Sequence, residues 1–176
     1  REGSMETLMA DLTAHRVDMV LTDRPIDSSF HIRAYNHLLG ECSTSLFAAP
    51  SLAKQYSANF PTALHNAPIL MPTEDTVIGS NLRHWFQKSS IRPRIVVECV
   101  DNALLATFGQ AGKGLFCGPT ALQKEISNLY NVEPVGEISE IRERFYAISL
   151  ERRISHPAVL AITNTARGIL KQSNEA

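Results

Sequence analysis

The sequence has no excess of charge of either sign. Seventeen Lys and Arg face eighteen Asp and Glu, which gives a formal net charge of -1 and a pI near 6.7. A domain that binds nucleic acid through its phosphates needs a basic surface, so we do not expect these residues alone to bind DNA. The sequence also lacks the roughly 18-residue apolar run that spans a bilayer, and its first residues lack a signal-peptide pattern. We therefore expect a cytoplasmic protein that makes no contact with a membrane.

Cysteine is scarce. Cys42, Cys99 and Cys117 are odd in number, widely spaced and set in apolar segments. This pattern favours small buried thiols over a disulfide framework or a metal site. The remaining composition, 44% hydrophobic and 20% charged, is that of an ordinary globular chain long enough for one domain or two small lobes.

Catalytic and nucleotide-binding motifs are absent. There is no nucleophile elbow, no HExxH or CxxC, and the six histidines show no ligand spacing. The glycine-rich segment 109–114 lacks the spacing of a phosphate-binding loop and lies between a predicted helix and a predicted strand, the reverse of the order that such a loop requires. We therefore expect neither an enzyme nor a resident cofactor.

Helix and strand patterns alternate along the chain. Met5, Leu8, Met9 and Leu12, for example, occupy one face of a helix that precedes an apolar strand. Strands alternating with helices of about ten residues indicate an α/β fold built on mostly parallel sheet. Strands are predicted at 17–22, 42–48, 67–71, 94–100, 115–118, 131–135 and 143–151, and helices at 5–15, 50–56, 79–90, 102–112, 120–129 and 156–170.

Polar residues follow several predicted strands, where open α/β sheets bind their ligands. Three predicted helix starts add free backbone N–H groups near the same edge. A purely structural interpretation remains open, because Ser4 and Asp101 are good helix caps, 23–25 is a turn sequence and 73–75 suits a solvated loop. The candidate binding residues are Ser4, Thr22, Asp23, Pro72, Thr73, Glu74, Asp75, Asp101, Asn102, Gly118 and Pro119.

Ordered segments of the chain resemble the effector-binding domain of LysR-type transcriptional regulators. SMETLMADLTAHRVDMVLTDRPID (4–27) resembles the family's helix and strand ending in "lDlai", and GECSTSLFAAP (40–50) its hinge strand. VVECVDNALLATFGQAGKGLFCGP (96–119) is similar to the family signature "e.ds...l..lvaaGlGia.lP". ERFYAISLERRISHPAVLAI (143–162) resembles the returning strand and last helix. The resemblance extends over nearly the whole chain.

This resemblance implies a fold like that of type II periplasmic binding proteins. Two Rossmann-like α/β lobes would be joined by two crossing strands, with residues 1–44 and 148–176 in lobe I and 45–147 in lobe II. A small ligand or cation would bind in the cleft. The family's DNA-binding helix-turn-helix domain, and the first strand and helix of lobe I, would lie outside this chain. The domain would form a homodimer or tetramer, partly through helices 5–15 and 101–112, and would reach DNA only through the other domain.

The resemblance places the effector positions at Ser4, Thr22 and 101–102. Asp23 follows Thr22, and Asp101 stands where a hydroxyl is common in the family. Carboxylates there would repel an organic anion and favour a cation. Four shorter segments are similar to family members that activate sodium/proton antiporter genes: VDMVLTDRPIDS, LGECSTSLF, HWF and RRISHPAVLAITNT. This similarity implies a response to sodium or lithium. Sodium is a hard ion that prefers oxygen ligands. The candidate metal ligands are Asp23, Glu74, Asp75 and Asp101, and a small organic effector remains the alternative.

Two other functions compete with a ligand-sensing, dimerising regulatory domain. The first is a solute-binding protein of the same fold that delivers a small ligand to a transporter. Three unpaired cysteines and the lack of a visible export signal argue against it. The second is an enzyme on this fold, which would need a nucleophile or acid/base constellation that the sequence does not show.

Overall fold

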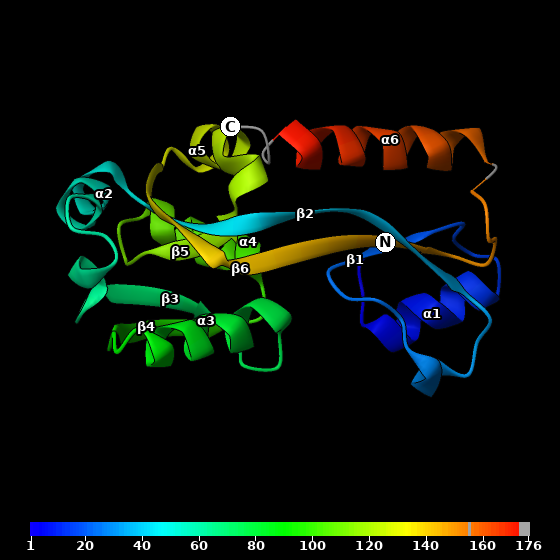
Figure 1. Ribbon diagram of the computed structural model, residues 1–176, viewed down its shortest axis with the longest axis horizontal. Helices are drawn as coiled ribbons and strands as arrows, with labels where there is room; N and C mark the ends of the chain where they lie inside the picture. The colour runs from blue at the N-terminus through cyan, green and yellow to red at the C-terminus, as the bar shows by residue number, and fades with distance from the viewer. Residues whose placement is uncertain (155, 173–176) are drawn as a thin grey trace. The chain divides into compact units, whose positions relative to one another are not determined.

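The chain forms two compact units in the computed structural model, which describes residues 1–154 and 156–172. Unit 1 combines Arg1–Glu41 with the described residues from Arg144 onward, and unit 2 is Cys42–Glu143. Both boundaries lie within long strands, β2 (Tyr35–Ala48) and β6 (Glu133–Ser149), which run through both units (Figure 1). The structure thus divides the chain a few residues before the predicted crossing points at 44/45 and 147/148.

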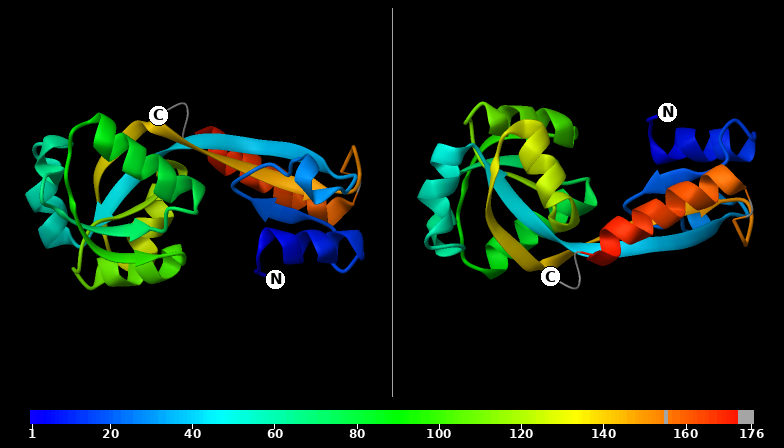
Figure 2. Two further views of the ribbon diagram at one scale, coloured as in Figure 1. Left: turned by 90° about the horizontal axis from the view of Figure 1, so that it is seen from below. Right: turned by 90° about the horizontal axis from the view of Figure 1, so that it is seen from above.

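Unit 1 packs two helices on the strands. β1 (Val20–Thr22) pairs antiparallel with β6, with Val20 opposite Ile148. The two views of Figure 2 show α1 (Met5–Thr13) and α6 (Pro157–Gln172) on opposite faces of these strands. A short 3-10 turn, η1 (Ser28–Phe30), lies in the connection from β1 to β2. The core comprises Met5, Met9, Leu12, Val20 and Ile148, so the predicted apolar face of the first helix is the buried one.

Unit 2 is built on a mixed sheet rather than the mostly parallel one predicted. β3 (Pro68–Pro72) and β4 (Arg94–Cys99) are parallel, and a parallel bridge from Ile69 to Leu115 brings β5 (Phe116–Pro119) alongside β3. β5 pairs antiparallel with β2. The antiparallel pairs arise because the connecting strands β2 and β6 run against their neighbours β5 and β1.

The helices of unit 2 enclose two apolar clusters. The larger cluster includes Leu46, Ile69, Leu82 and Ile138, and the smaller one centres on Phe47, Leu70, Leu105 and Phe116. The helices and 3-10 turns of this unit are α2 (Pro50–Ser57), η2 (Thr62–Leu64), α3 (Val77–Lys88), α4 (Asn102–Gln110), η3 (Thr120–Leu122) and α5 (Gln123–Tyr130).

Two strands are longer than predicted, and one is less buried. β2 begins at Tyr35, and the predicted strands at 131–135 and 143–151 belong to one strand, β6. Within β6 the buried residues Val135, Ile138 and Ile141 recur every third position, so the alternation that marks a strand is missing. The apolar strand β4 lies at a sheet edge, where Ile95 remains 45% exposed.

The three cysteines are free thiols, as predicted, but their burial differs. Cys42 and Cys117 are buried and Cys99 is half-buried. Burial in apolar surroundings raises the pKa of the Cys117 and Cys42 thiols above the usual value for cysteine.

Within the part of the chain that the structure describes, no helix has the length and apolar character needed to cross a bilayer.

Candidate functional site

The carboxyl ends of three parallel strands meet at one edge of unit 2. Thr73 follows β3, Asp101 follows β4, and Pro119 ends β5. The backbone N–H of Thr73 donates to the carbonyl of Cys99 at 3.3 Å, which ties the first two loops together. The unit 2 rim, as we name this edge, therefore collects every candidate binding residue of the second unit: Pro72, Thr73, Glu74, Asp75, Asp101, Asn102, Gly118 and Pro119.

The loop after β3 is held in a fixed turn. The Thr76 hydroxyl donates to the carbonyl of Thr73 at 2.6 Å and accepts from the N–H of Gly79 at 3.1 Å, which caps α3. The Thr73 hydroxyl oxygen is buried and has no hydrogen-bond partner among the described residues. It is thus a polar atom of the rim that a ligand could satisfy.

Gly79 lets the first turn of α3 approach this loop. A Cβ built at Gly79 would collide with the carbonyl oxygen of Thr73 and would lie 2.7 Å from that of Pro72. Only a residue without a side chain fits there, because both obstacles are backbone atoms. The glycine therefore contributes to the shape of the rim.

Asp101 caps the helix that follows β4. Its Oδ1 accepts from the N–H groups of Ala103 at 2.8 Å and Leu104 at 3.2 Å. The capping role considered from the sequence is therefore present. Among the described residues nothing bonds to Oδ2, and Asn102, the first residue of α4, is exposed. The same carboxylate can hold its helix and still present an oxygen to a ligand.

The rim is acidic. Arg83 of α3 places Nη2 2.7 Å from Glu98 Oε1, and its Nε lies 3.9 Å from Glu74 Oε2. One guanidinium thus serves two carboxylates, while Asp75 and Asp101 add two further exposed negative charges. This balance favours a cation over an anion at the rim.

A row of buried hydroxyls on β2 lies beside the rim, and the sequence analysis missed it. Ser45 pairs with Gly118 across the β2–β5 ladder, and its Oγ lies 2.7 Å from Thr120 Oγ1. Thr44, opposite Pro119, donates to Glu143 at 2.8 Å, and the adjacent Ser43 donates to Glu137 at 2.6 Å. The signal was available, because three consecutive hydroxyl residues inside an apolar strand must find buried partners.

The candidate residues of unit 1 lie at one edge of that unit. Ser4 caps α1 by accepting from the N–H of Thr7 at 3.3 Å, so its capping interpretation is also present. Thr22 ends β1 and accepts from the N–H of Arg24 at 3.3 Å, and Asp23 is exposed. The backbone and Ser4 lower the pKa of Glu6, with a smaller contribution from Arg24. The contribution from Arg24 indicates that the loop after β1 lies near the start of α1.

The four carboxylates predicted to bind sodium do not form a ready ligand set. Asp23 belongs to unit 1, and Glu74, Asp75 and Asp101 belong to unit 2. Throughout residues 1–154 and 156–172, no three His, Cys, Asp or Glu side chains are grouped as metal ligands would be. Sodium binding therefore remains a prediction that needs hydroxyl or backbone carbonyl oxygens to complete the coordination shell.

Comparison with known proteins identifies the family. Residues 1–170 match the family model described as LysR substrate binding domain. The chain is 32% identical over 165 residues to the transcriptional activator protein NhaR of Escherichia coli strain K12, covering 93% of this chain and 54% of that protein. NhaR of Shigella flexneri matches equally well. The chain thus spans about half the length of these curated relatives.

Solved structures show the same fold at low sequence identity. The effector binding domain of BenM with its effector benzoate gives a TM-score of 0.68 at 14% identity, covering 100% of this chain and 79% of that domain. Vibrio fischeri DarR in complex with DNA also gives 0.68, at 15% identity, covering 96% of this chain and 56% of that one. These are regulators with the type II periplasmic-binding-protein-like fold. The chain belongs to the LysR substrate binding domain family, and it is a regulatory binding domain rather than an enzyme.

Proposed function

We propose that this chain is the ligand-sensing and dimerising part of a LysR-type transcriptional activator that works in the cytoplasm. The observation that carries the proposal is the family match over residues 1–170. The DNA-binding function would reside in a separate domain of the full protein, because the present chain corresponds to 54% of NhaR and carries no basic excess.

The proposed effector is sodium or lithium, bound at the unit 2 rim. The acidic balance around Glu74, Asp75 and Asp101 supports a cation, and the unsatisfied Thr73 hydroxyl supplies a neutral oxygen. The narrower resemblance to regulators of sodium/proton antiporter genes supports these two ions over others. A small organic cation is the alternative occupant.

Binding at the rim would act on the rest of the regulator through β2. Pro119 of the rim faces Thr44 of β2, and β2 continues from unit 2 into unit 1. A ligand shifts a conformational equilibrium only if it binds one arrangement more tightly. We infer that the cation favours one alignment of β5 against β2, and that this preference reaches the DNA-binding domains of the assembled regulator.

Thermal unfolding of the chain in sodium, lithium, potassium and choline chlorides tests the cation site. Matched ionic strength removes general screening. A ligand at about ten times its dissociation constant should add about 1.4 kcal/mol, a rise of a few degrees for a domain of this size. Identical melting curves in the four salts would contradict a sodium or lithium site in this chain.

Two variants assign that effect to the rim. Asp101→Asn keeps a good helix cap and removes the charge, so the sodium- or lithium-selective rise should disappear while the melting temperature in choline chloride changes little. Glu125→Gln, at an exposed acidic residue of α5, is the matched control and should keep the full rise. A selective rise that survives in Asp101→Asn would place the cation elsewhere.

Dimerisation is proposed to involve α1 and α4. On α4, Leu104 is 41% exposed, so its apolar side chain is accessible to a second copy of the chain. Sedimentation velocity of the chain at micromolar concentration tests this part of the proposal. We expect a dimer that Leu104→Asp weakens, whereas a monomer at every concentration would contradict dimerisation through these residues.

A further inference from the structure

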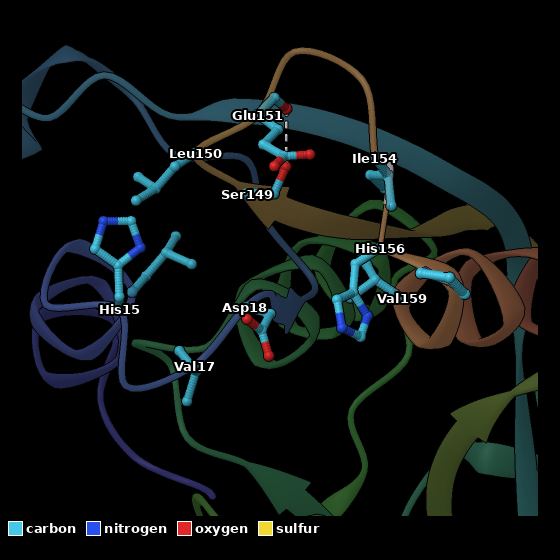
Figure 3. Close-up of a pocket in the computed structure, with 11 residues that line it drawn as sticks. His15, Val17, Asp18, Ser149, Leu150, Glu151, Ile154, His156 and Val159 are labelled. Carbon is cyan, nitrogen blue, oxygen red and sulfur yellow. Dashed lines mark hydrogen bonds between the residues drawn. The ribbon is translucent and has the colours of Figure 1, made fainter.

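Unit 1 contains a cavity of about 400 Å³, a size common for sites that hold small molecules (Figure 3). The cavity lies between the C-terminal end of α1, the residues before β1, the end of β6 and the first turn of α6. Elements from both halves of unit 1, far apart in sequence, therefore form its walls. No candidate residue identified in the sequence analysis lines it.

The inner wall of the cavity is apolar. Leu12 and Val159 are buried there, and Val17, Leu150 and Ile154 are half-buried around them. Such a surface favours a hydrocarbon body over a free ion or a strongly hydrated molecule.

Polar side chains that are available to hydrogen-bond a ligand lie at the mouth of the cavity. Figure 3 shows Asp18 and His156 turned toward the same space, with His15 on the side of α1. These side chains are exposed and make no hydrogen bond or ion pair with any other residue that the structure describes. The Ser149 hydroxyl is already engaged, because it donates to the carbonyl of Glu151 at 2.9 Å and lies 2.9 Å from His37 Nε2.

We propose that this cavity binds a small organic amine. The ammonium group would lie on the Asp18 carboxylate, with an imidazole nitrogen of His15 or His156 accepting a second hydrogen bond. The hydrocarbon part would lie on the apolar inner wall. An organic acid is disfavoured, because its carboxylate would meet Asp18 and, at the mouth, Glu151.

The cavity is distinct from the binding residues that the sequence predicted in unit 1. Ser4 and Thr22 lie at the start of α1 and the end of β1, whereas the cavity lies at the end of α1 and before the start of β1. The nine residues of α1 place its two ends about 13 Å apart at 1.5 Å per residue. The inference therefore does not depend on a cation at the unit 2 rim.

Three probes with the same ring test the charge preference. Benzylammonium, benzyl alcohol and benzoate would be titrated into the isotopically labelled chain at matched ionic strength, with backbone amide NMR as the measurement. We expect benzylammonium to bind most tightly and to shift the amides of 12–18 and 149–154. Equal affinity for all three probes, or shifts confined to other residues, would overturn the proposal.

Variants separate the charged contact from the apolar one. Asp18→Asn should weaken benzylammonium about tenfold or more and leave benzyl alcohol unchanged, since one charge-assisted hydrogen bond is lost. Ile154→Ala should weaken both probes by a similar factor, because it removes part of the apolar wall. Glu2→Gln, at an exposed acidic residue that does not line the cavity, is the control and should bind as the unaltered chain does. Benzylammonium affinity that is unchanged in Asp18→Asn would contradict the assigned contact.

Discussion

Two of the candidate binding residues, Asp101 and Ser4, have a structural role besides the binding role predicted for them. Asp101 holds the first turn of α4 through Oδ1, and the geometry leaves Oδ2 outside the cap. Ser4 caps α1 in the same way. Both roles were considered from the sequence, but only the structure shows which atom performs the capping. A test of binding must therefore separate the loss of a cap from the loss of a charge.

Replacing Asp101 in two ways achieves this separation. Asp101→Ala should lower the stability by about 1 kcal/mol, because α4 loses its cap, and the melting temperature should fall by a few degrees. Asp101→Asn should retain most of that stability. Thermal unfolding in choline chloride measures both variants. Equal melting temperatures for the two variants would show that capping by residue 101 contributes little.

Asp11 should make the free energy of unfolding of unit 1 depend on pH. Hydrogen bonds from Arg1 at 2.7 Å and Arg16 at 3.1 Å hold the pKa of this carboxyl below its usual value. A group whose pKa is lowered by folding contributes stability above its unfolded pKa, and this contribution is lost as the pH falls through the folded pKa. Asp11→Asn should therefore be less stable than the unaltered chain near neutral pH and nearly equal to it in strong acid.

Urea unfolding at about pH 7 and about pH 3 measures this difference. Glu2→Gln, which removes an exposed carboxylate with no ion pair among the described residues, is the control and should show no such dependence. A constant difference between Asp11→Asn and the unaltered chain across this range would contradict the assigned ion pairs.

Helix and strand order was largely predictable, because local patterns determine it. The spacing of Met5, Leu8, Met9 and Leu12 predicted α1, and the cap before Asn102 predicted α4. The position of each strand within its sheet was not predictable from local patterns. β4 is as apolar as an interior strand and yet lies at an edge, since the identity of its neighbours depends on long-range pairing. β6 was divided in two because its burial repeats every third residue.

The candidate site was predictable only where its residues follow from the order of the strands. The carboxyl-end rule placed Thr73 and Asp101 at one edge, because both follow parallel strands that are neighbours in the sheet. The cavity of unit 1 could not be predicted, since its walls come from α1, β6 and α6 and depend on how those elements pack. The hydroxyl row on β2 was visible as residues, but its partners Glu137 and Glu143 lie about a hundred residues later.

Packing of α3 against the loop after β3 should tolerate no side chain at residue 79. Alanine in a helix gains roughly 0.5–1 kcal/mol over glycine, but the methyl group at this position meets the carbonyl oxygen of Thr73. Overpacking costs about 1–3 kcal/mol, so Gly79→Ala should lower the melting temperature by several degrees. Gly168→Ala in α6, where nothing lies within 4 Å, is the matched control and should raise it slightly. A stabilised Gly79→Ala would show that the loop moves freely.

The whole molecule has the organisation expected of a sensor. Two compact units share the long strands β2 and β6, and these shared strands give a ligand site on one unit a covalent path to the other. The ion pair between Arg144 and Glu41, at 3.0 Å, joins β6 to β2 beside the unit boundary. Membership of the LysR substrate binding domain family accounts for the rim of polar groups on a chain of this organisation.

Backbone amide NMR of the labelled chain in sodium, lithium, potassium and choline chlorides, at one ionic strength, tests the central claim most directly. The measurement reports where a cation binds, which a melting temperature does not. The account predicts that sodium or lithium selectively shifts the amides of Thr73, Glu74, Asp101 and Asn102 and that potassium and choline leave them unchanged. Spectra that are identical in all four salts, or selective shifts that avoid the unit 2 rim, would contradict it.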